Sequence, residues 1–292
     1  MRLATFETAT GPRLGVVRDA TLLELPVDRG WPTSMRALAG AGKETLDELR
    51  RWSEVASPDG GLPVGQVRLL APIPNPGKIV AIGLNYADHA AEGGVEVPAR
   101  PLVFAKFTSS VIGPGESIAW DRALTDRVDY EAELGVIIGS RARLVGRSEA
   151  LEHVFGYTCL NDVSARDLQE GDVQWVRAKS LDTFCPSGPW IVTADEIPKP
   201  DELRLECSVN GELRQSASTG DMFFNVPTLI EALSHAFTLE PGDIIATGTP
   251  AGVGASRKPA TFLSDGDEVV VRISSIGELH NTCRVRGRPS TE

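Results

Sequence analysis

The segment VDYEAELGVIIG, residues 128–139, carries an acid at every second position of its first half. Successive side chains of a strand point to opposite faces, so Asp129, Glu131 and Glu133 would share one face. Two interpretations are open: a strand with one solvent-facing side, or a row of carboxylates that binds a cation. This segment alone does not decide between them.

The segment GYTCLNDVSARDLQ, residues 156–169, supplies a third acid. It begins as an apolar strand and ends in a polar turn that contains Asp162, an arrangement typical of the rim of a pocket. If Asp162 lies beside Glu131 and Glu133, the site offers three carboxylates and neither Cys nor His. Such hard oxygen ligands favour Mg²⁺ or Mn²⁺ over zinc. About three coordination positions then stay open, enough for a bidentate 2-oxo acid and a water.

A histidine and a glutamate stand three residues apart in NYADHAAEGG, residues 85–94. On a short helix His89 and Glu92 would share a face and could form a hydrogen bond. A carboxylate beside an imidazole raises its basicity and suits it to take a proton from water. The alternative is an ordinary surface ion pair.

The elements that must position these residues differ between the two parts of the chain. Short strands are expected over residues 3–7, 12–18 and 21–25, and a helix over 33–54. Pro72, Pro74 and Pro76 then favour extended backbone. We therefore expect a small N-terminal α+β domain over residues 1–70, a Pro-rich linker over 71–77 and a catalytic domain over 78–292.

Strand patterns dominate after the linker, separated by Gly, Pro and Asp turns. Strands are expected over residues 78–83, 102–107, 131–139, 190–194, 203–210, 243–247 and 267–273. Asn210-Gly211 predicts a hairpin turn, and residues 226–237 predict an amphipathic helix. The pattern indicates a mixed α+β, β-rich fold with peripheral helices, without the regular strand–helix alternation of a parallel α/β sheet.

Composition excludes several classes of protein. The formal net charge of −11 and the absence of a basic cluster argue against nucleic acid as a partner. No apolar run is long enough to cross a membrane, and the N-terminus lacks a secretory signal, so we expect a cytoplasmic protein without a membrane partner. The four cysteines are scattered, as expected for buried apolar residues.

Several blocks in a fixed order resemble the fumarylacetoacetate hydrolase family. The ExE strand and GYTCLNDVSARDLQ are followed by AKSLDTFCPSGPW and LEPGDIIATGTPAGVG, and GLNYADHAAE, VFAKFTSSVIGPG and GDEVVVRISSIGELHN fit the same family. The resemblance covers roughly residues 72–285. It implies the family's mixed β-roll, a homodimer and a role in the catabolism of aromatic compounds.

The resemblance also implies roles for individual residues. Glu131, Glu133 and Asp162 match the family's metal ligands, for Mg²⁺ or Mn²⁺. Lys179 matches a lysine beside metal and substrate; taken alone, it could be a solvated surface lysine. The residues that match substrate-orienting positions are Arg166, Gln169 and Thr249. His89 and Glu92 match a catalytic dyad on a mobile lid, for which Gly93-Gly94 would supply a hinge.

The reaction implied is one on a small 2-oxo acid that passes through an enolate. We expect hydrolysis of the C–C bond of a 2,4-dioxo acid of the acylpyruvate type. Oxaloacetate decarboxylation and isomerisation or hydration of a 2-hydroxy-diene acid are the alternatives, and a non-catalytic metal-binding protein is a more distant one. Leu84, Phe107 and Ala178 depart from residues common in the family; Leu84 and Phe107 are expected to line the pocket and to affect substrate identity.

Overall fold

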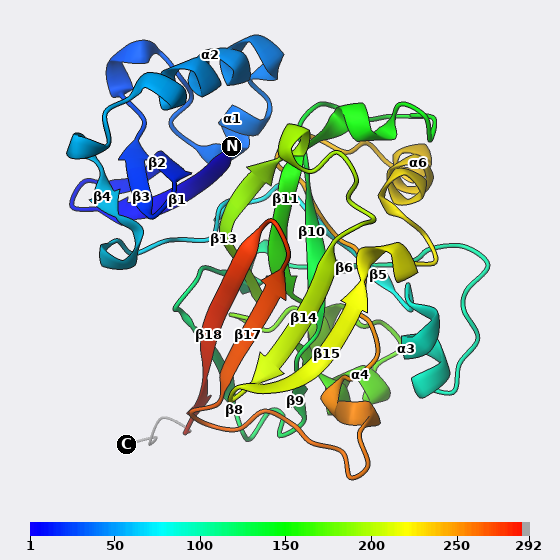
Figure 1. Cartoon of the computed structure of the whole chain (residues 1–292). Coiled ribbons are helices and arrows are strands. Elements are labelled where there is room, and N and C mark those ends of the chain that lie inside the picture. The colour runs from blue at the N-terminus through cyan, green and yellow to red at the C-terminus, as the bar shows by residue number, and fades with distance from the viewer. Residues whose placement is uncertain (288–292) are drawn as a thin grey trace.

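The fold is a β-rich roll with helices at its periphery. A computed structural model describes residues 1–287 (Figure 1). The α-helices of this part are α1 (Met35–Ala39), α2 (Gly42–Val55), α3 (Ala87–Glu92), α4 (Arg166–Gly171), α5 (Val176–Lys179) and α6 (Val226–Ala236). The expected mixed α+β, β-rich class is confirmed, and most expected strands lie within one or two residues of the observed ones.

The larger of the sheets has eleven strands. In spatial order they are β4 (Leu62–Pro63), β3 (Thr21–Glu24), β2 (Gly11–Arg18), β1 (Arg2–Thr8), β13 (Cys185–Thr193), β11 (Val154–Asn161), β10 (Ala132–Ile138), β16 (Ile244–Ala246), β5 (Ile79–Gly83) and β6 (Leu102–Lys106), with β7 (Val111–Ile112) paired to β13. Most neighbours are antiparallel, but β16 runs parallel to β5 and β7 to β13. The sheet is therefore mixed.

A five-stranded sheet packs against the middle of the larger one (Figure 1). Its strands are β15 (Glu212–Ser218), β14 (Arg204–Val209), β17 (Glu268–Ile273), β18 (Gly277–Arg286) and β8 (Ser117–Asp121), and a separate two-stranded pair joins β9 (Val128–Asp129) to β12 (Ser164–Ala165). The predicted Asn210-Gly211 turn connects β14 to β15, and both residues have positive φ, as such a hairpin requires.

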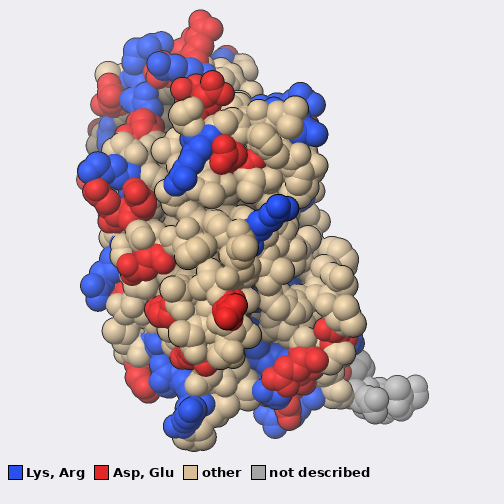
Figure 2. Space-filling model, turned by 90° about the vertical axis from the view of Figure 1, so that its right-hand side faces the viewer, with Lys and Arg blue, Asp and Glu red and all other residues tan. Residues whose placement is uncertain are grey.

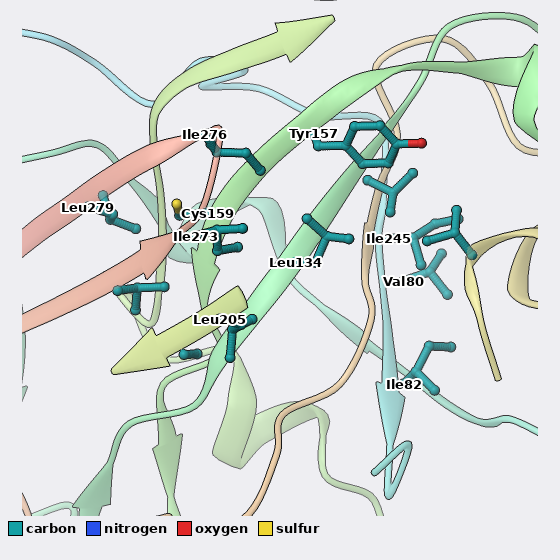
Figure 3. Close-up of a cluster of buried hydrophobic side chains, with 14 of the residues drawn as sticks. Val80, Ile82, Leu134, Tyr157, Cys159, Leu205, Ile245, Ile273, Ile276 and Leu279 are labelled. Carbon is teal, nitrogen blue, oxygen red and sulfur yellow. The ribbon is translucent and has the colours of Figure 1, made fainter. Parts of the chain in front are cut away.

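The space between the two sheets is filled with aliphatic side chains. Figure 3 shows Leu134 of β10 between Leu205 of β14 and the side chains of β5 and β16. These residues are fully buried, and each aliphatic side chain removed from water contributes about 1.5–3 kcal/mol before entropic costs. This packing holds β10 and β11 in the middle of the fold, and the candidate site lies where β10 begins and β11 ends.

Strand β10 is buried on both faces, which corrects the interpretation of the acidic segment as a strand with one solvent-facing side. Leu134 and Val136 point into the core between the sheets, whereas Ile137 belongs to a second apolar cluster on the other face. Glu131 and Glu133 are likewise buried. The carboxylates therefore lie inside the protein.

The N-terminal segment extends the larger sheet, because β1 pairs with β13. Met35 and Leu38 of α1 share an apolar cluster with Ile137 and Phe155 of the roll. The single helix expected over 33–54 is two helices, because the chain turns at Gly42, where φ is +81°. The division of the chain at residue 70 stays a prediction.

Two expectations from composition concern the described residues directly. All four cysteines are buried and free, in agreement with the expectation. No helix within residues 1–287 is both long and apolar enough to span a membrane.

Candidate metal centre and active site

Three carboxylates meet where β10 begins and β11 ends. Ala132 of β10 pairs with Asn161 of β11, and the amide of Asp162 donates to the carbonyl oxygen of Glu131 over 2.8 Å. One oxygen from each of Glu131, Glu133 and Asp162 lies within 4.8 Å of the others. The structure thus brings the three predicted ligands together, and their role in metal binding stays a prediction.

Two buried cations contact this carboxylate cluster. Nζ of Lys179, at the end of α5, lies 2.7 Å from Oε2 of Glu131 and 3.0 Å from Oδ2 of Asp162. Nη1 of Arg166 lies 2.7 Å from Oε1 of Glu131, and its Nε lies 2.8 Å from Oδ2 of Asp129. Lys179 is buried and is therefore not a solvated surface lysine.

A third buried cation, Lys106, was not among the residues predicted for the site. Its Nζ lies 2.5 Å from Oδ1 of Asp162 and also donates to the carbonyl oxygens of Val163 and Lys179. Asp129, the buried partner of Arg166, was likewise missed as a site residue, although it stands in the acidic alternation. A lone lysine at the end of the apolar segment 102–106 was the available signal for Lys106.

The balance of charge leaves Glu133 without a cation partner. Four buried carboxylates, those of Asp129, Glu131, Glu133 and Asp162, face three buried cations. Within the described residues, Glu133 accepts only the amide of Gly248, over 2.8 Å. Burial, followed by the charges of Asp162 and Glu131, raises the pKa of Glu133 well above its ordinary value.

Glu131 shows the opposite behaviour. Burial by itself would raise its pKa, but Lys179 and Arg166 outweigh burial and hold the pKa at about 2. The cluster therefore contains one uncompensated carboxylate beside two compensated ones. A divalent cation fits this set, because its ligands are hard oxygens and its charge would compensate Glu133. Glu131, Glu133 and Asp162 are the residues that would hold it.

A cavity of about 190 Å³ opens beside the carboxylate cluster. It is lined by Ile82, Gly83, Leu84, His89, Val95, Phe104, Glu131, Arg166, Gln169, Trp175, Lys179 and Thr249. Leu84 lines it as expected, with φ of +55°. The expectation for Phe107 is wrong: its ring lines a separate groove with Val173 and Leu181, because it lies beyond the end of β6 and points outward.

The predicted substrate-orienting residues all line this cavity. Gln169 accepts from Nη1 of Arg166 over 2.9 Å, so its side chain is oriented by that guanidinium. The hydroxyl of Thr249 accepts from Nε2 of Gln215 over 2.7 Å. Gln215, on β15 of the other sheet, was not predicted; it fixes the loop that carries Thr249 by also donating to the carbonyl oxygen of Pro250.

His89 lies over the cavity, but its predicted hydrogen bond with Glu92 is not formed. Nδ1 of His89 and Oε2 of Glu92 are 3.7 Å apart, beyond hydrogen-bond range. The Glu92 carboxylate instead accepts the amide of Gly252, at 3.0 and 3.3 Å from its two oxygens. Burial lowers the pKa of His89, since it outweighs the opposing charge of Glu131. The charge of Glu92 acts to raise this pKa, as expected, but burial outweighs it, so the imidazole is neutral at pH 7.

Two buried polar atoms of cavity-lining residues have no hydrogen-bond partner within residues 1–287. They are Nδ1 of His89 and Nη2 of Arg166. A buried polar atom without a partner is costly, and such atoms are typically explained by a catalytic role or by a bound water or ion. A neutral imidazole and a guanidinium N–H beside a carboxylate cluster can bind an anion and move a proton on it.

Comparisons with known proteins identify the family of this chain. The family model described as fumarylacetoacetate (FAA) hydrolase C-terminal matches residues 78–284. The chain is 42% identical over 292 residues to the mitochondrial oxaloacetate tautomerase FAHD2B of Bos taurus, covering 96% of this chain and 91% of that protein. It is 47% identical over 249 residues to the oxaloacetate tautomerase YisK of Bacillus subtilis (strain 168), covering 84% of this chain and 80% of that protein.

A solved relative contains a metal ion. It is the maleylpyruvate hydrolase of Sphingobium sp. SYK-6 in complex with manganese(II) and pyruvate, 36% identical, with a TM-score of 0.81 over 99% of this chain and 100% of that one. The family model spans more than half of this chain, and this chain matches both tautomerases along most of their length. The buried carboxylates, the roll that holds them and these matches have one explanation: the chain is a member of the fumarylacetoacetate hydrolase family.

Proposed function

We propose that the chain catalyses the keto–enol tautomerisation of a small 2-oxo acid of the oxaloacetate type, with Mg²⁺ or Mn²⁺ as cofactor. The observation that carries the proposal is a cavity of only about 190 Å³ in which one neutral histidine faces the carboxylate cluster. Such a volume favours a substrate of a few carbon atoms. Tautomerisation needs a single group that moves a proton, and His89 can do this without a hydrogen bond to Glu92.

The metal, bound by Glu131, Glu133 and Asp162, would polarise the 2-oxo group as a Lewis acid. Arg166 and Lys179 provide positive charge at the wall of the cavity, where they orient the carboxylate of the substrate. His89 removes a proton from C3 of the keto form, and the imidazolium then delivers that proton to the oxygen at C2, which completes the enol and leaves His89 neutral again. The reverse transfer regenerates the keto form, so no other reactant is consumed.

Hydrolysis of an acylpyruvate, the reaction expected from the sequence, is the second candidate. Leu84, Val95 and Trp175 give the cavity an apolar part of its lining that suits an uncharged acyl group. A structural relative is a maleylpyruvate hydrolase, which supports this reaction class independently. In this reaction His89 would remove a proton from water, and the resulting hydroxide would attack the C4 carbonyl. The C3–C4 bond then breaks to give a carboxylic acid and the enol of a 2-oxo acid.

One experiment separates the two candidates. Enol-oxaloacetate, acetylpyruvate and fumarylpyruvate are supplied with Mg²⁺ or Mn²⁺, and the products are identified by NMR in D₂O. We expect enol-oxaloacetate to convert to the keto form, with deuterium at C3, much faster than either dioxo acid is cleaved. Rapid cleavage of a dioxo acid with slow tautomerisation would replace the proposal by hydrolysis.

The matched controls concern the carboxylates. Glu131→Gln should remove the activity together with metal binding, whereas Glu96→Gln, a change on the exposed loop after α3, should leave both intact. Full activity of wild type in excess chelator would contradict the need for a metal in either reaction.

A further inference from the structure

The segment around α3 is attached to the rest of the fold at two points. At its start, Tyr86 forms a bridge with Met222, and the carbonyl oxygen of Asn85 accepts the amide of Phe223 over 2.7 Å. Further along, the Glu92 carboxylate accepts the amide of Gly252. In the described part of the chain, this is the one hydrogen-bonded contact between residues 87–100 and segments outside residues 86–100.

The residue that Glu92 contacts belongs to a firmly held loop. In this loop, residues 247–254, the carbonyl oxygen of Gly252 accepts the hydroxyl of Tyr130 over 3.1 Å, and the amide of Gly254 donates to Asp129 over 2.7 Å. The φ of Gly252 is +103°, and a Cβ there would lie 2.2 Å from the carbonyl oxygen of Arg214. Glycine is thus required at this close approach, and the amide of Gly252 is fixed in space.

The same loop reaches the carboxylate cluster at its other end. The amide of Gly248 donates to Oε2 of Glu133, and Thr249, next in sequence, lines the cavity. His89 lies on α3 between the two attachment points and also lines the cavity. The position of the imidazole over the cluster therefore depends on whether the end of α3 stays attached to this loop.

We propose, building on the proposed function, that Glu92 is a positioning residue that attaches the end of α3 to the amide of Gly252 and so places His89 over the cavity. Its carboxylate does not act as the hydrogen-bond partner that activates the imidazole. The geometry supports this assignment: the contact to Gly252 is 3.0 Å, whereas Nδ1 of His89 is 3.7 Å away and without a partner among the described residues. Release of the contact frees the part of the chain that ends in Gly93-Gly94.

Glutamine distinguishes the two roles, because it keeps an oxygen that accepts the amide of Gly252 but loses the charge. The variants Glu92→Gln and Glu92→Ala are compared with wild type by amide hydrogen exchange over residues 89–95. In Glu92→Ala, exchange should accelerate by about 10–100-fold, the factor that corresponds to a hydrogen bond to a charged group. Glu92→Gln should exchange within about threefold to tenfold of wild type.

Activity provides the second readout. Tautomerisation of enol-oxaloacetate should fall in Glu92→Ala and recover for the most part in Glu92→Gln, because the acceptor is restored. Glu96→Gln, which removes a carboxylate from the same segment, is the matched control and should resemble wild type in both measurements. Equal loss of activity in both Glu92 variants, with exchange unchanged, would overturn the proposal and make Glu92 the charge partner of His89.

The exchange measurement needs no substrate, so it also separates this proposal from the proposed function. If wild type proves inactive on enol-oxaloacetate but Glu92→Ala exchanges faster, the attachment stands and only the assumed reaction falls. If exchange in Glu92→Ala equals that of wild type, the attachment is refuted whatever the activity.

Discussion

Glu133 differs from its two neighbours in the carboxylate cluster through its partners. Glu131 and Asp162 contact buried cations, whereas Glu133 accepts a single backbone amide within the described residues. The pKa of Glu133 is raised by burial and by the charges of Asp162 and Glu131. At a pH above the ordinary pKa of glutamate, the folded protein therefore keeps a proton on Glu133 that the unfolded chain has already released. Rising pH therefore favours unfolding of the metal-free protein through this group.

The first prediction concerns Glu133→Gln. In chelator, this variant should be more stable than wild type, and the difference should grow as pH rises from about 5 to 8. Removing an uncompensated buried group should raise the free energy of unfolding by about 1–3 kcal/mol. Each kcal/mol raises the melting temperature by about 2–4 °C. Thermal melts at several pH values, with and without Mn²⁺, provide the measurement. Added Mn²⁺ should stabilise wild type and not the variant. A metal-free variant that melts below wild type at pH 8 would contradict this account.

The second prediction concerns the pH dependence that His89 gives to activity. Burial lowers its pKa below the ordinary value of 6.5, so the neutral, proton-accepting form persists as pH falls to that value. Activity measured as kcat/KM should stay level from pH 8 to 6.5 and decline only below it. His89→Ala should lose about 10²–10⁴-fold of kcat/KM while it still binds Mn²⁺. A decline that begins above pH 6.5, or an active His89→Ala variant, would rule out His89 as the base.

The residues that could be predicted from the sequence are those with a local pattern. Alternation along residues 128–133 placed Glu131 and Glu133 on one face, and the polar turn after β11 drew attention to Asp162. Lys106 and Gln215 reach the site from β6 and β15, so only tertiary packing brings them there. The expected bond between His89 and Glu92 followed from helical spacing, but spacing cannot reveal that the amide of Gly252 competes for the carboxylate.

Two strands, β10 and β11, and the loop after β16 surround the carboxylate cluster, and helices α3, α4 and α5 add His89, Arg166 and Lys179. Most strands were predicted because apolar and β-branched runs end at Gly, Pro and Asp turns. The burial of both faces of β10 was not predicted, because alternation of polar and apolar residues usually indicates a strand with one solvent-exposed face. The loop over residues 247–254 shows no periodic pattern at all; its shape follows from glycines in left-handed backbone and from contacts with Gln215 and Asp129.

The third prediction tests this loop at Gly248. Its φ is +101°, and a Cβ would lie 2.8 Å from Cβ of Asn85. Gly248→Ala should therefore cost about 1–3 kcal/mol and displace the amide that Glu133 accepts. We expect a lower melting temperature and weaker Mn²⁺ binding by calorimetry. Gly266→Ala is the control: its φ is +83°, but nothing lies within 4 Å, so it should lose some stability and keep its Mn²⁺ affinity. Unchanged Mn²⁺ affinity in Gly248→Ala would contradict a role for the loop in placing Glu133.

At the scale of the whole molecule, one edge of the larger sheet stands out. Strand β6 ends the strand order, and within residues 1–287 no strand pairs with its outer side. Its side chains Leu102 and Val103 are exposed, as is Phe107 beyond its end. Charged residues gather toward the ends of the face shown in Figure 2, while uncharged residues cover most of its middle. The cytoplasmic location expected from the sequence stays a prediction, since some relatives are named as mitochondrial proteins.

The last prediction is that the chain forms a homodimer through this edge. Unpaired strand edges with apolar side chains readily pair with another chain, and a second copy presents the same edge with matching residues. Light scattering at micromolar concentration should give about twice the chain mass of 31.2 kDa. Val103, 43% exposed on β6, and Val55, 83% exposed at the end of α2, provide a matched pair of substitutions. Val103→Asp should give a monomer, because a buried charge would oppose pairing, whereas Val55→Asp should remain dimeric. A monomeric wild type would refute the homodimer, and a dimeric Val103→Asp variant would place the interface elsewhere.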